Sequence, residues 1–148
     1  MSVTLNRDVL AAIRAHGRET YPNECCGALI GSGGTVRHAA PLPNTTEEGA
    51  RRRFLVRPVD YRQAEADATR LKGALLGFYH SHPDALARPS QYDLDHAWPS
   101  FWYVIVAVQQ GGPAQMTVWR LAEDRSRFGE ERLEGDTTMP EPIGPAQG

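Results

Sequence analysis

The segment FWYVIVAVQ, residues 101–109, most restricts what this chain can fold into. It is rich in β-branched and aromatic residues, which favour extended strands. Because apolar side chains occur on both of its faces, the segment is predicted to be a buried central strand. A second strongly apolar run, ALLGFYHSH at residues 74–82, predicts another strand. Any fold proposed for this chain must therefore include at least these two strands.

Two other segments have the periodicity of helices. The first is predicted to begin after Thr4 as its N-cap and to end at Gly17. The second is predicted to begin at Pro58, which suits the first turn of a helix, and to be stopped by Gly73. Apolar side chains recur at helical spacing in both segments: Leu5, Val9, Leu10 and Ile13 in the first, and Tyr61, Ala64, Ala68 and Leu71 in the second.

The remaining predicted strands are separated by turn-forming residues. CCGALIGS is predicted to be a buried strand that pairs in antiparallel fashion with TVRHAAPL across the Gly33-Gly34 turn. Further strands are expected at RFLVRP (53–58), at QMTVWRL (115–121) and, as an edge strand, at RFGEERLE (127–134). Together these elements predict an α/β fold with a mixed, largely antiparallel sheet, two longer helices and one short helix after the histidines.

The length of 148 residues is that of one domain with its own core. We expect residues 1–134 to form this domain. Beyond Glu134 the sequence reads GDTTMPEPIGPAQG, which is rich in proline and glycine and has almost nothing to bury. Residues 135–148 are therefore expected to form a disordered tail.

Charge and composition argue against several classes of function. The formal net charge of -2 argues against a nucleic-acid-binding protein, which would normally have a basic face. No apolar run approaches the roughly 20 residues that span a membrane, and the N-terminus lacks the pattern of a signal peptide. The adjacent Cys25 and Cys26 do not form a stapling disulfide framework, and free buried thiols fit a cytoplasmic protein.

Two histidines end the apolar run at residues 74–82. In a strand, side chains two residues apart project from the same face, so His80 and His82 can converge on one ion. Two imidazoles leave a tetrahedral ion short of ligands. A catalytic zinc usually has three protein ligands and keeps one position for water, so a third ligand is needed.

Asp93 is the candidate third ligand. Pro83 ends the strand, and Pro89 and Ser90 then open a helix with Ser90 as N-cap and Asp93 in the first turn. That turn can face back toward the strand end, and the positive end of the helix dipole favours an ionised carboxylate there. Ser90-x-x-Asp93 is also an ordinary capping pair, and a His-x-His pair is commonly structural. From spacing alone, a metal site and structural motifs explain these residues equally well.

A longer pattern favours the metal site. The segment from His80 to Asp93 resembles the H-x-H-x(7)-S-x-x-D signature of the JAMM, or MPN-plus, metalloproteases. That family also carries a glutamate upstream, after the first helix and before a cysteine and a glycine. The segment YPNECCGALIG resembles this element, with Glu24 at the matching position. The resemblance covers most of residues 5–120 and implies the curved, cytidine deaminase-like α/β sheet of that family.

The resemblance also implies the role of each residue. One zinc ion would be held by His80, His82 and Asp93, and its fourth position would hold a water whose pKa falls from about 16 to near 7. Glu24 would carry the proton of that water to the leaving amine, an effect typically worth about 10²–10⁴ in rate. Without the downstream signature, Glu24 would be interpreted as a surface carboxylate at the entrance of a strand. Ser90 would donate a hydrogen bond to the oxyanion.

The family resemblance also implies a class of substrate. JAMM proteases cleave peptide or isopeptide bonds after the C-terminal Gly-Gly of ubiquitin or ubiquitin-like proteins. This short chain resembles the stand-alone prokaryotic members, whose substrates are often sulfur carriers of the ThiS/MoaD type. We therefore expect a ubiquitin-like or sulfur-carrier partner, with residues 42–52 as a candidate clamp for its tail. The oligomeric state stays open.

Two rival functions have sequence features that differ from those of this chain. Zinc deaminases have an H-x-E motif with a later P-C-x-x-C, whereas this sequence has His-x-His and no Cys-x-x-Cys. Non-catalytic MPN scaffolds usually lack one or more of the five site positions, all of which are present here. The scaffold is therefore the main alternative.

Other residues with suitable chemistry are expected to lie outside the site. His96 is expected to face outward, one turn after Asp93. Asp84 and Asp95 are not expected to be ligands, because Asp84 follows His82 too closely and Asp95 faces away from Asp93. The two cysteines are expected to pack as small apolar groups.

Overall fold

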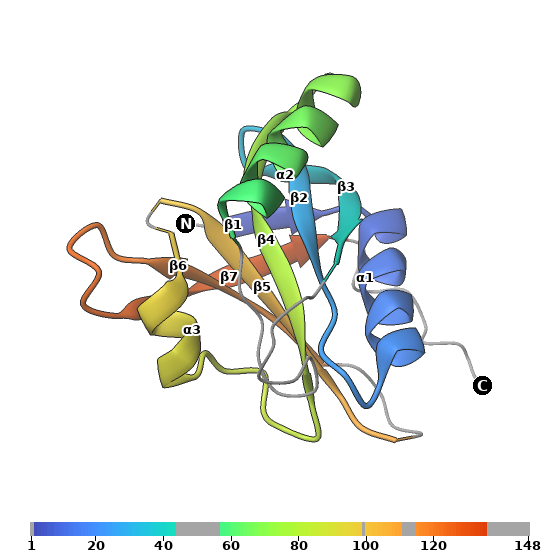
Figure 1. Ribbon diagram of the computed structural model, residues 1–148, viewed down its shortest axis with the longest axis vertical. Coiled ribbons are helices and arrows are strands. Elements are labelled where there is room, and N and C mark those ends of the chain that lie inside the picture. The colour runs from blue at the N-terminus through green and yellow to red at the C-terminus, as the bar shows by residue number, and fades with distance from the viewer. Residues whose placement is uncertain (1, 44–56, 99, 111–114, 136–148) are drawn as a thin grey trace.

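Figure 1 shows the computed structural model of the protein, which describes residues 2–43, 57–98, 100–110 and 115–135. In chain order, its elements are β1 (Ser2–Leu5), α1 (Arg7–Thr20), β2 (Cys26–Ser32), β3 (Thr35–Leu42), α2 (Pro58–Arg70), β4 (Ala74–Pro83), α3 (Gln91–His96), β5 (Trp102–Val108), β6 (Gln115–Leu121) and β7 (Phe128–Gly135). Most of the predicted strand at 53–58, most of the clamp at 42–52 and the tail beyond residue 135 lie outside the described residues.

The strands form a closed barrel in the order β1-β3-β2-β4-β5-β6-β7. β1 closes the barrel because it pairs in parallel with both β3 and β7. β4 and β5 are also parallel, whereas the other neighbours are antiparallel. The structure is thus α/β, with a mixed sheet and helices, as expected. The prediction of an edge strand at residues 127–134 is wrong, because β7 pairs with β6 on one side and with β1 on the other.

The start of α1 differs from the predicted start. Thr4 is not the N-cap, because it belongs to β1 and pairs with Thr35 and Glu134. Asn6 caps the helix instead, and its side-chain oxygen accepts a hydrogen bond from the Val9 N–H at 2.9 Å. Of the apolar residues with helical spacing, Leu5 therefore belongs to β1, and the others belong to α1.

The end of α1 also differs. Gly17 does not end the helix, which continues to Thr20. A Cβ at position 17 would lie 2.9 Å from a methyl carbon of Val108, so the glycine allows α1 to approach β5 closely. α2 begins at Pro58 as predicted and ends at Arg70, just before Gly73. None of the helices in the described part of the chain is long and apolar enough to cross a membrane.

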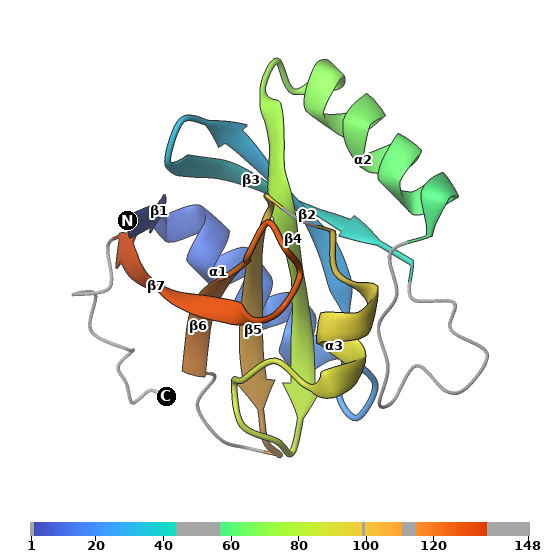
Figure 2. The ribbon, with the colours of Figure 1, turned by 90° about the vertical axis from the view of Figure 1, so that its left-hand side faces the viewer.

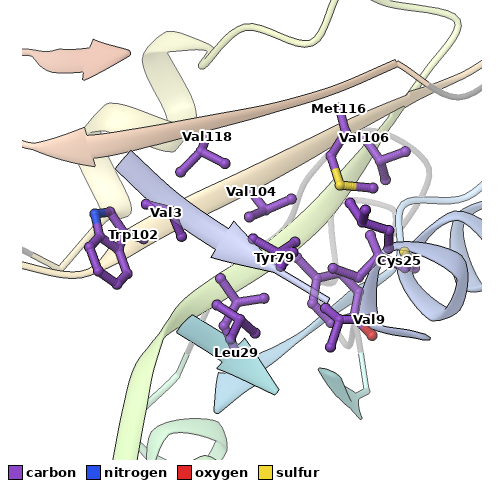
Figure 3. Packing of buried hydrophobic residues seen from close by; sticks show 14 of the residues in the cluster. Val3, Val9, Cys25, Leu29, Tyr79, Trp102, Val104, Val106, Met116 and Val118 are labelled. Carbon is purple, nitrogen blue, oxygen red and sulfur yellow. The ribbon is translucent and has the colours of Figure 1, made fainter. Parts of the chain in front are cut away.

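β5 is a buried strand with neighbours on both sides, as predicted. All seven residues of β5 are buried, and the strand lies between β4 and β6. Figure 2 shows α1 and α2 on different sides of β4. Tyr79 packs in the apolar cluster next to α1, which Figure 3 shows around Val104 and Val106, whereas Phe78 packs in the cluster next to α2. Because side chains alternate along a strand, the even-numbered residues of β4 lie on the face away from α1.

Candidate metal centre

His80 and His82 lie at the end of β4, between β2 and β5. Alternation along the strand places both side chains on the face away from α1, and they are only 1% and 7% exposed. The structure brings their Nε2 atoms to 3.1 Å from each other. At this distance two lone pairs would repel each other, so a proton on a ring or a cation between the rings is favourable.

Asp93 joins the two histidines from the first turn of α3. Its amide donates to the Ser90 hydroxyl oxygen at 3.0 Å, and its Oδ2 accepts the Ser90 N–H at 2.8 Å, so the predicted N-cap is observed. The same Oδ2 lies 3.3 Å from Nε2 of His80 and 3.2 Å from Nε2 of His82. A capping pair and a metal site are therefore compatible, since the same carboxylate oxygen completes the cap and faces both imidazoles.

The three atoms have the spacing expected for a tetrahedral metal site. Ligand atoms at about 2.0–2.1 Å from a tetrahedral zinc lie about 3.3–3.4 Å from one another. The three distances here are 3.1, 3.3 and 3.2 Å. Two imidazoles and one carboxylate are also a donor set that zinc accepts. The residues therefore fit a zinc ion.

The ring of His82 is oriented by a backbone carbonyl. Its Nδ1 lies 2.8 Å from the Leu86 oxygen, which can only accept, so Nδ1 carries the hydrogen. In the neutral ring, Nε2 then keeps a lone pair that can bind a cation, whereas in the protonated ring the Nε2–H donates to Asp93. This second contact fixes both the tautomer and the direction of the ligand atom. The sequence does not reveal this contact, because any residue can supply a carbonyl.

The electrostatics keep Asp93 charged. Burial alone raises the pKa of its carboxyl, but the neighbouring His80 and hydrogen bonds from His80, His82 and the Ser90 N–H outweigh this effect. The pKa of Asp93 therefore lies far below its ordinary value. Burial lowers the pKa of His82, yet its hydrogen bonds with Asp93 and the Leu86 carbonyl leave that pKa raised overall. At neutral pH the site thus presents an ionised carboxylate to an incoming cation.

Glu24 lies beside the cluster without being part of it. It precedes β2, is 5% exposed, and lines a cavity of about 490 Å³ together with His82 and Ser90. Among the described residues, the group whose potential ligand atoms all lie within 4.8 Å of one another contains His80, His82 and Asp93, but not Glu24. The structure thus places a carboxylate in the same cavity as His82 and Ser90, outside the cluster of His80, His82 and Asp93.

The structure places the other candidates outside the cluster. His96 is exposed and stacks on Tyr92. Asp84 accepts the Tyr21 hydroxyl, and Asp95 accepts the Gln91 amide at 2.8 Å. Both cysteines are buried free thiols. Burial is the main reason that the pKa of Cys25 rises to about 11, which makes this thiol a poor nucleophile near neutral pH.

Sequence reasoning also missed two contacts of Ser81. The side chain between the two histidines is completely buried, and its hydroxyl oxygen accepts the Cys25 N–H at 2.8 Å. The Ser81 N–H in turn donates to the Cys25 oxygen at 3.1 Å. The sequence does contain a signal for such a contact, namely a serine within an apolar strand, because a buried hydroxyl needs a hydrogen-bond partner.

Residues 6–122 match the family model described as prokaryotic homologs of the JAB domain. The chain belongs to this family. Among curated relatives, the CysO-cysteine peptidase of Mycobacterium tuberculosis is 26% identical over 82% of this chain and 84% of its own length. The desampylase of Haloferax volcanii is 32% identical over 70% of this chain and 78% of its own length. The chain is therefore a JAB-family hydrolase with peptidase and desampylase relatives.

Another relative and two solved structures extend the comparison. The tail tip assembly protein K of Escherichia phage N15 is 34% identical over 60% of this chain, which spans only 34% of that protein's length. A solution structure from Salinibacter ruber is 37% identical over 97% of this chain and 95% of its own, with a TM-score of 0.70. A JAB1/MPN domain protein from Archaeoglobus fulgidus is 19% identical over 89% of this chain and 97% of its own, with a TM-score of 0.57, and shares the fold.

Proposed function

We propose that this JAB protein is a zinc-dependent hydrolase of the peptide or isopeptide bond after the C-terminal Gly-Gly of a ubiquitin-like or sulfur-carrier protein. The observation that carries the proposal is the convergence of His80, His82 and Asp93, with ligand atoms 3.1–3.3 Å apart, beside a cavity that also holds Glu24. When bound there, a zinc ion acidifies water and polarises the scissile carbonyl.

Glu24 moves the proton in this proposal. Its carboxylate accepts a proton from the attacking water and delivers it to the leaving amine, so that the C–N bond can break. Its burial in the same cavity as His82 and Ser90 supports this role, because few bulk waters compete for the proton. Its place outside the ligand cluster leaves it available to take and give the proton.

Ser90 stabilises the oxyanion in this proposal. As N-cap, it uses a lone pair of its oxygen to accept the Asp93 N–H. The hydroxyl hydrogen therefore remains able to donate toward the cavity that Ser90 lines. Capping the helix and binding the substrate oxygen are compatible, because they use different parts of one hydroxyl.

The substrate class rests on the named relatives. The names CysO-cysteine peptidase and desampylase favour a carrier-like protein substrate over a general peptide. A tail that ends in Gly-Gly has no side chains to obstruct its approach to a buried site, and residues 42–52 are the proposed clamp for it. We place the reaction in the cytoplasm, where the two free buried thiols would stay reduced.

A Glu24→Gln variant tests this function. We expect it to keep one zinc per chain but to lose about 10²–10⁴ in the rate at which a carrier fused through Gly-Gly to a short peptide is cleaved. Cleavage is followed by mass spectrometry and metal content by atomic absorption. Chelator should stop the wild type, and added zinc should restore it. A wild type that purifies without metal and cleaves nothing would instead be a scaffold.

A further inference from the structure

Ser81 is a polar side chain in an apolar layer. It lies between the two histidines but points the other way, toward α1, because side chains alternate along β4. Ser81 is 0% exposed. A Cβ added at Gly17 would lie 3.7 Å from the Ser81 Cβ, so α1 packs directly over Ser81. The proposed reaction does not use this hydroxyl. Its partner is the Cys25 N–H, 2.8 Å away and also buried.

This hydrogen bond marks the place where the pairing of β2 with β4 stops. Cys26 pairs with His80, so the same register would place Cys25 opposite Ser81. In a hydrogen-bonded antiparallel pair, both residues exchange N–H···O bonds through their backbones. Here the Ser81 N–H does donate to the Cys25 oxygen at 3.1 Å, but the Cys25 N–H goes to the serine hydroxyl. The Ser81 hydroxyl oxygen thus accepts the hydrogen bond that the Ser81 backbone carbonyl would accept in a continued ladder.

The ladder ends one residue before it would reach Glu24. Continued pairing would place Glu24 directly opposite His82 and on the same face, with Cα atoms about 4.5–5.5 Å apart. A carboxylate so close to a ligand could enter the ligand cluster itself. In the structure, Glu24 lines the cavity with His82 but stays outside that cluster. The regular β2–β4 ladder is interrupted at Cys25, the residue after Glu24. Glu24 is therefore not held opposite His82 by strand pairing, which is consistent with its position outside the cluster.

We propose that Ser81 is a positioning residue for Glu24. Its hydroxyl ends the β2–β4 ladder at Cys25, and it thereby holds the Glu24 carboxylate within reach of the site but out of the ligand cluster. This inference rests on the proposed function, because it gives Glu24 the role of proton carrier. Ser81 touches neither substrate nor ion and acts only through the backbone at residues 24 and 25.

The kinetic test compares Ser81→Ala with Val106→Ala. Val106 is a suitable control because it pairs with Ser81 across β4 and β5, is 0% exposed and lies under the same part of α1. Both variants weaken the same layer, but only Ser81→Ala removes the acceptor for Cys25. We expect Ser81→Ala to keep one zinc and to change KM less than about twofold, while kcat falls at least about tenfold. Val106→Ala should keep kcat within about twofold at a similar loss of Tm.

Amide exchange gives a readout that needs no substrate. In Ser81→Ala, the Cys25 amide should exchange at least about tenfold faster relative to the Tyr79 amide, whereas Val106→Ala should leave this ratio unchanged. An unchanged ratio in Ser81→Ala overturns the inference, as does an increased ratio with wild-type kcat. If the wild type binds zinc but cleaves no Gly-Gly fusion, the proposed function fails, while the exchange ratio still decides whether Ser81 anchors this backbone.

A double variant shows whether Ser81 acts through Glu24. If it does, Ser81→Ala should reduce the residual cleavage of Glu24→Gln by less than about twofold, because the group that it positions is already inactive. If the two losses multiply, Ser81 supports the reaction independently of Glu24, and the inference is wrong.

Discussion

At the scale of single residues, one oxygen of the Asp93 carboxylate contacts three partners at once. Its Oδ2 accepts the Ser90 N–H at 2.8 Å and also lies 3.3 and 3.2 Å from the two imidazole nitrogens. An asparagine keeps an oxygen that can accept the Ser90 N–H but has no negative charge. Asp93→Asn therefore separates the capping role from the ligand role.

We expect Asp93→Asn to weaken zinc binding by more than about 100-fold, since even residues that merely support ligands change affinity about 10–100-fold. The unfolding midpoint of the metal-free protein should also fall, because the cap remains but the stabilising interaction of the negative charge with the two imidazoles is lost. Competition with a chromophoric chelator measures the affinity. Asp95→Asn is the matched control, since Asp95 lies on the same helix and its side chain accepts the Gln91 amide at 2.8 Å. Equal zinc affinity in both variants would remove Asp93 from the ligand set.

Much of the cluster could be predicted from local sequence rules. Alternation along a strand brings His80 and His82 to one face, and the spacing from Ser90 to Asp93 predicts a cap. That the capping carboxylate also meets both imidazoles is a tertiary contact, which spacing leaves undecided. The place of Glu24 was predicted only through the family resemblance. The contact of His82 with the Leu86 carbonyl has no signature at all, because the acceptor belongs to the backbone.

At the scale of elements, the packing of α1 against β5 depends on Gly17. A Cβ at this position would meet Val108 at 2.9 Å and Val106 at 3.4 Å. A glycine near a predicted helix end is usually a stop signal, and the close approach cannot be seen in the sequence, because Val108 lies far along the chain. The same limit applies to β1, whose four residues pair only with distant segments.

We predict that Gly17→Ala destabilises the protein by about 1–2 kcal/mol, because overpacking costs about 1–3 kcal/mol and better helix propensity returns up to about 1. Urea unfolding measures the change in the free energy of unfolding. Gly129→Ala is the control, since a Cβ there would have no neighbour within 4 Å. If Gly17→Ala were as stable as the wild type, α1 would have room to move away from β5.

At the scale of the whole molecule, closure of the barrel joins the two ends of the described chain. β1 lies between β3 and β7, so residues 2–5 pair with residues 132–135. Sequence patterns predicted most of the strands but not this closure, because pairing between distant segments is decided by the fold as a whole. The prediction of an edge strand failed for the same reason.

The buried thiols make global stability sensitive to alkaline pH. Burial raises the pKa of Cys25 from 9.0 to about 11. Because the folded pKa is the higher one, the contribution of Cys25 to stability is complete below pH 9 and is lost as the pH rises from about 9 to 11. Over this range the wild type should lose about 2–3 kcal/mol through this one group.

Cys25→Ala isolates this effect. The variant should be less stable than the wild type by a constant amount below pH 9, where the thiol is protonated in both states. Above pH 9 the difference should narrow, since the variant has no thiol to ionise. Free energies of unfolding from urea titrations at pH 7–11 measure the difference. A constant difference up to pH 11 would contradict the raised pKa.

One further consequence follows from the six residues of α3, whose N-cap is completed by the Asp93 oxygen that also faces both imidazoles. Helices this short are not stable in isolation. For the proposed zinc ion, capture of the metal and ordering of this segment would be thermodynamically linked, so its dissociation constant would include the cost of organising α3.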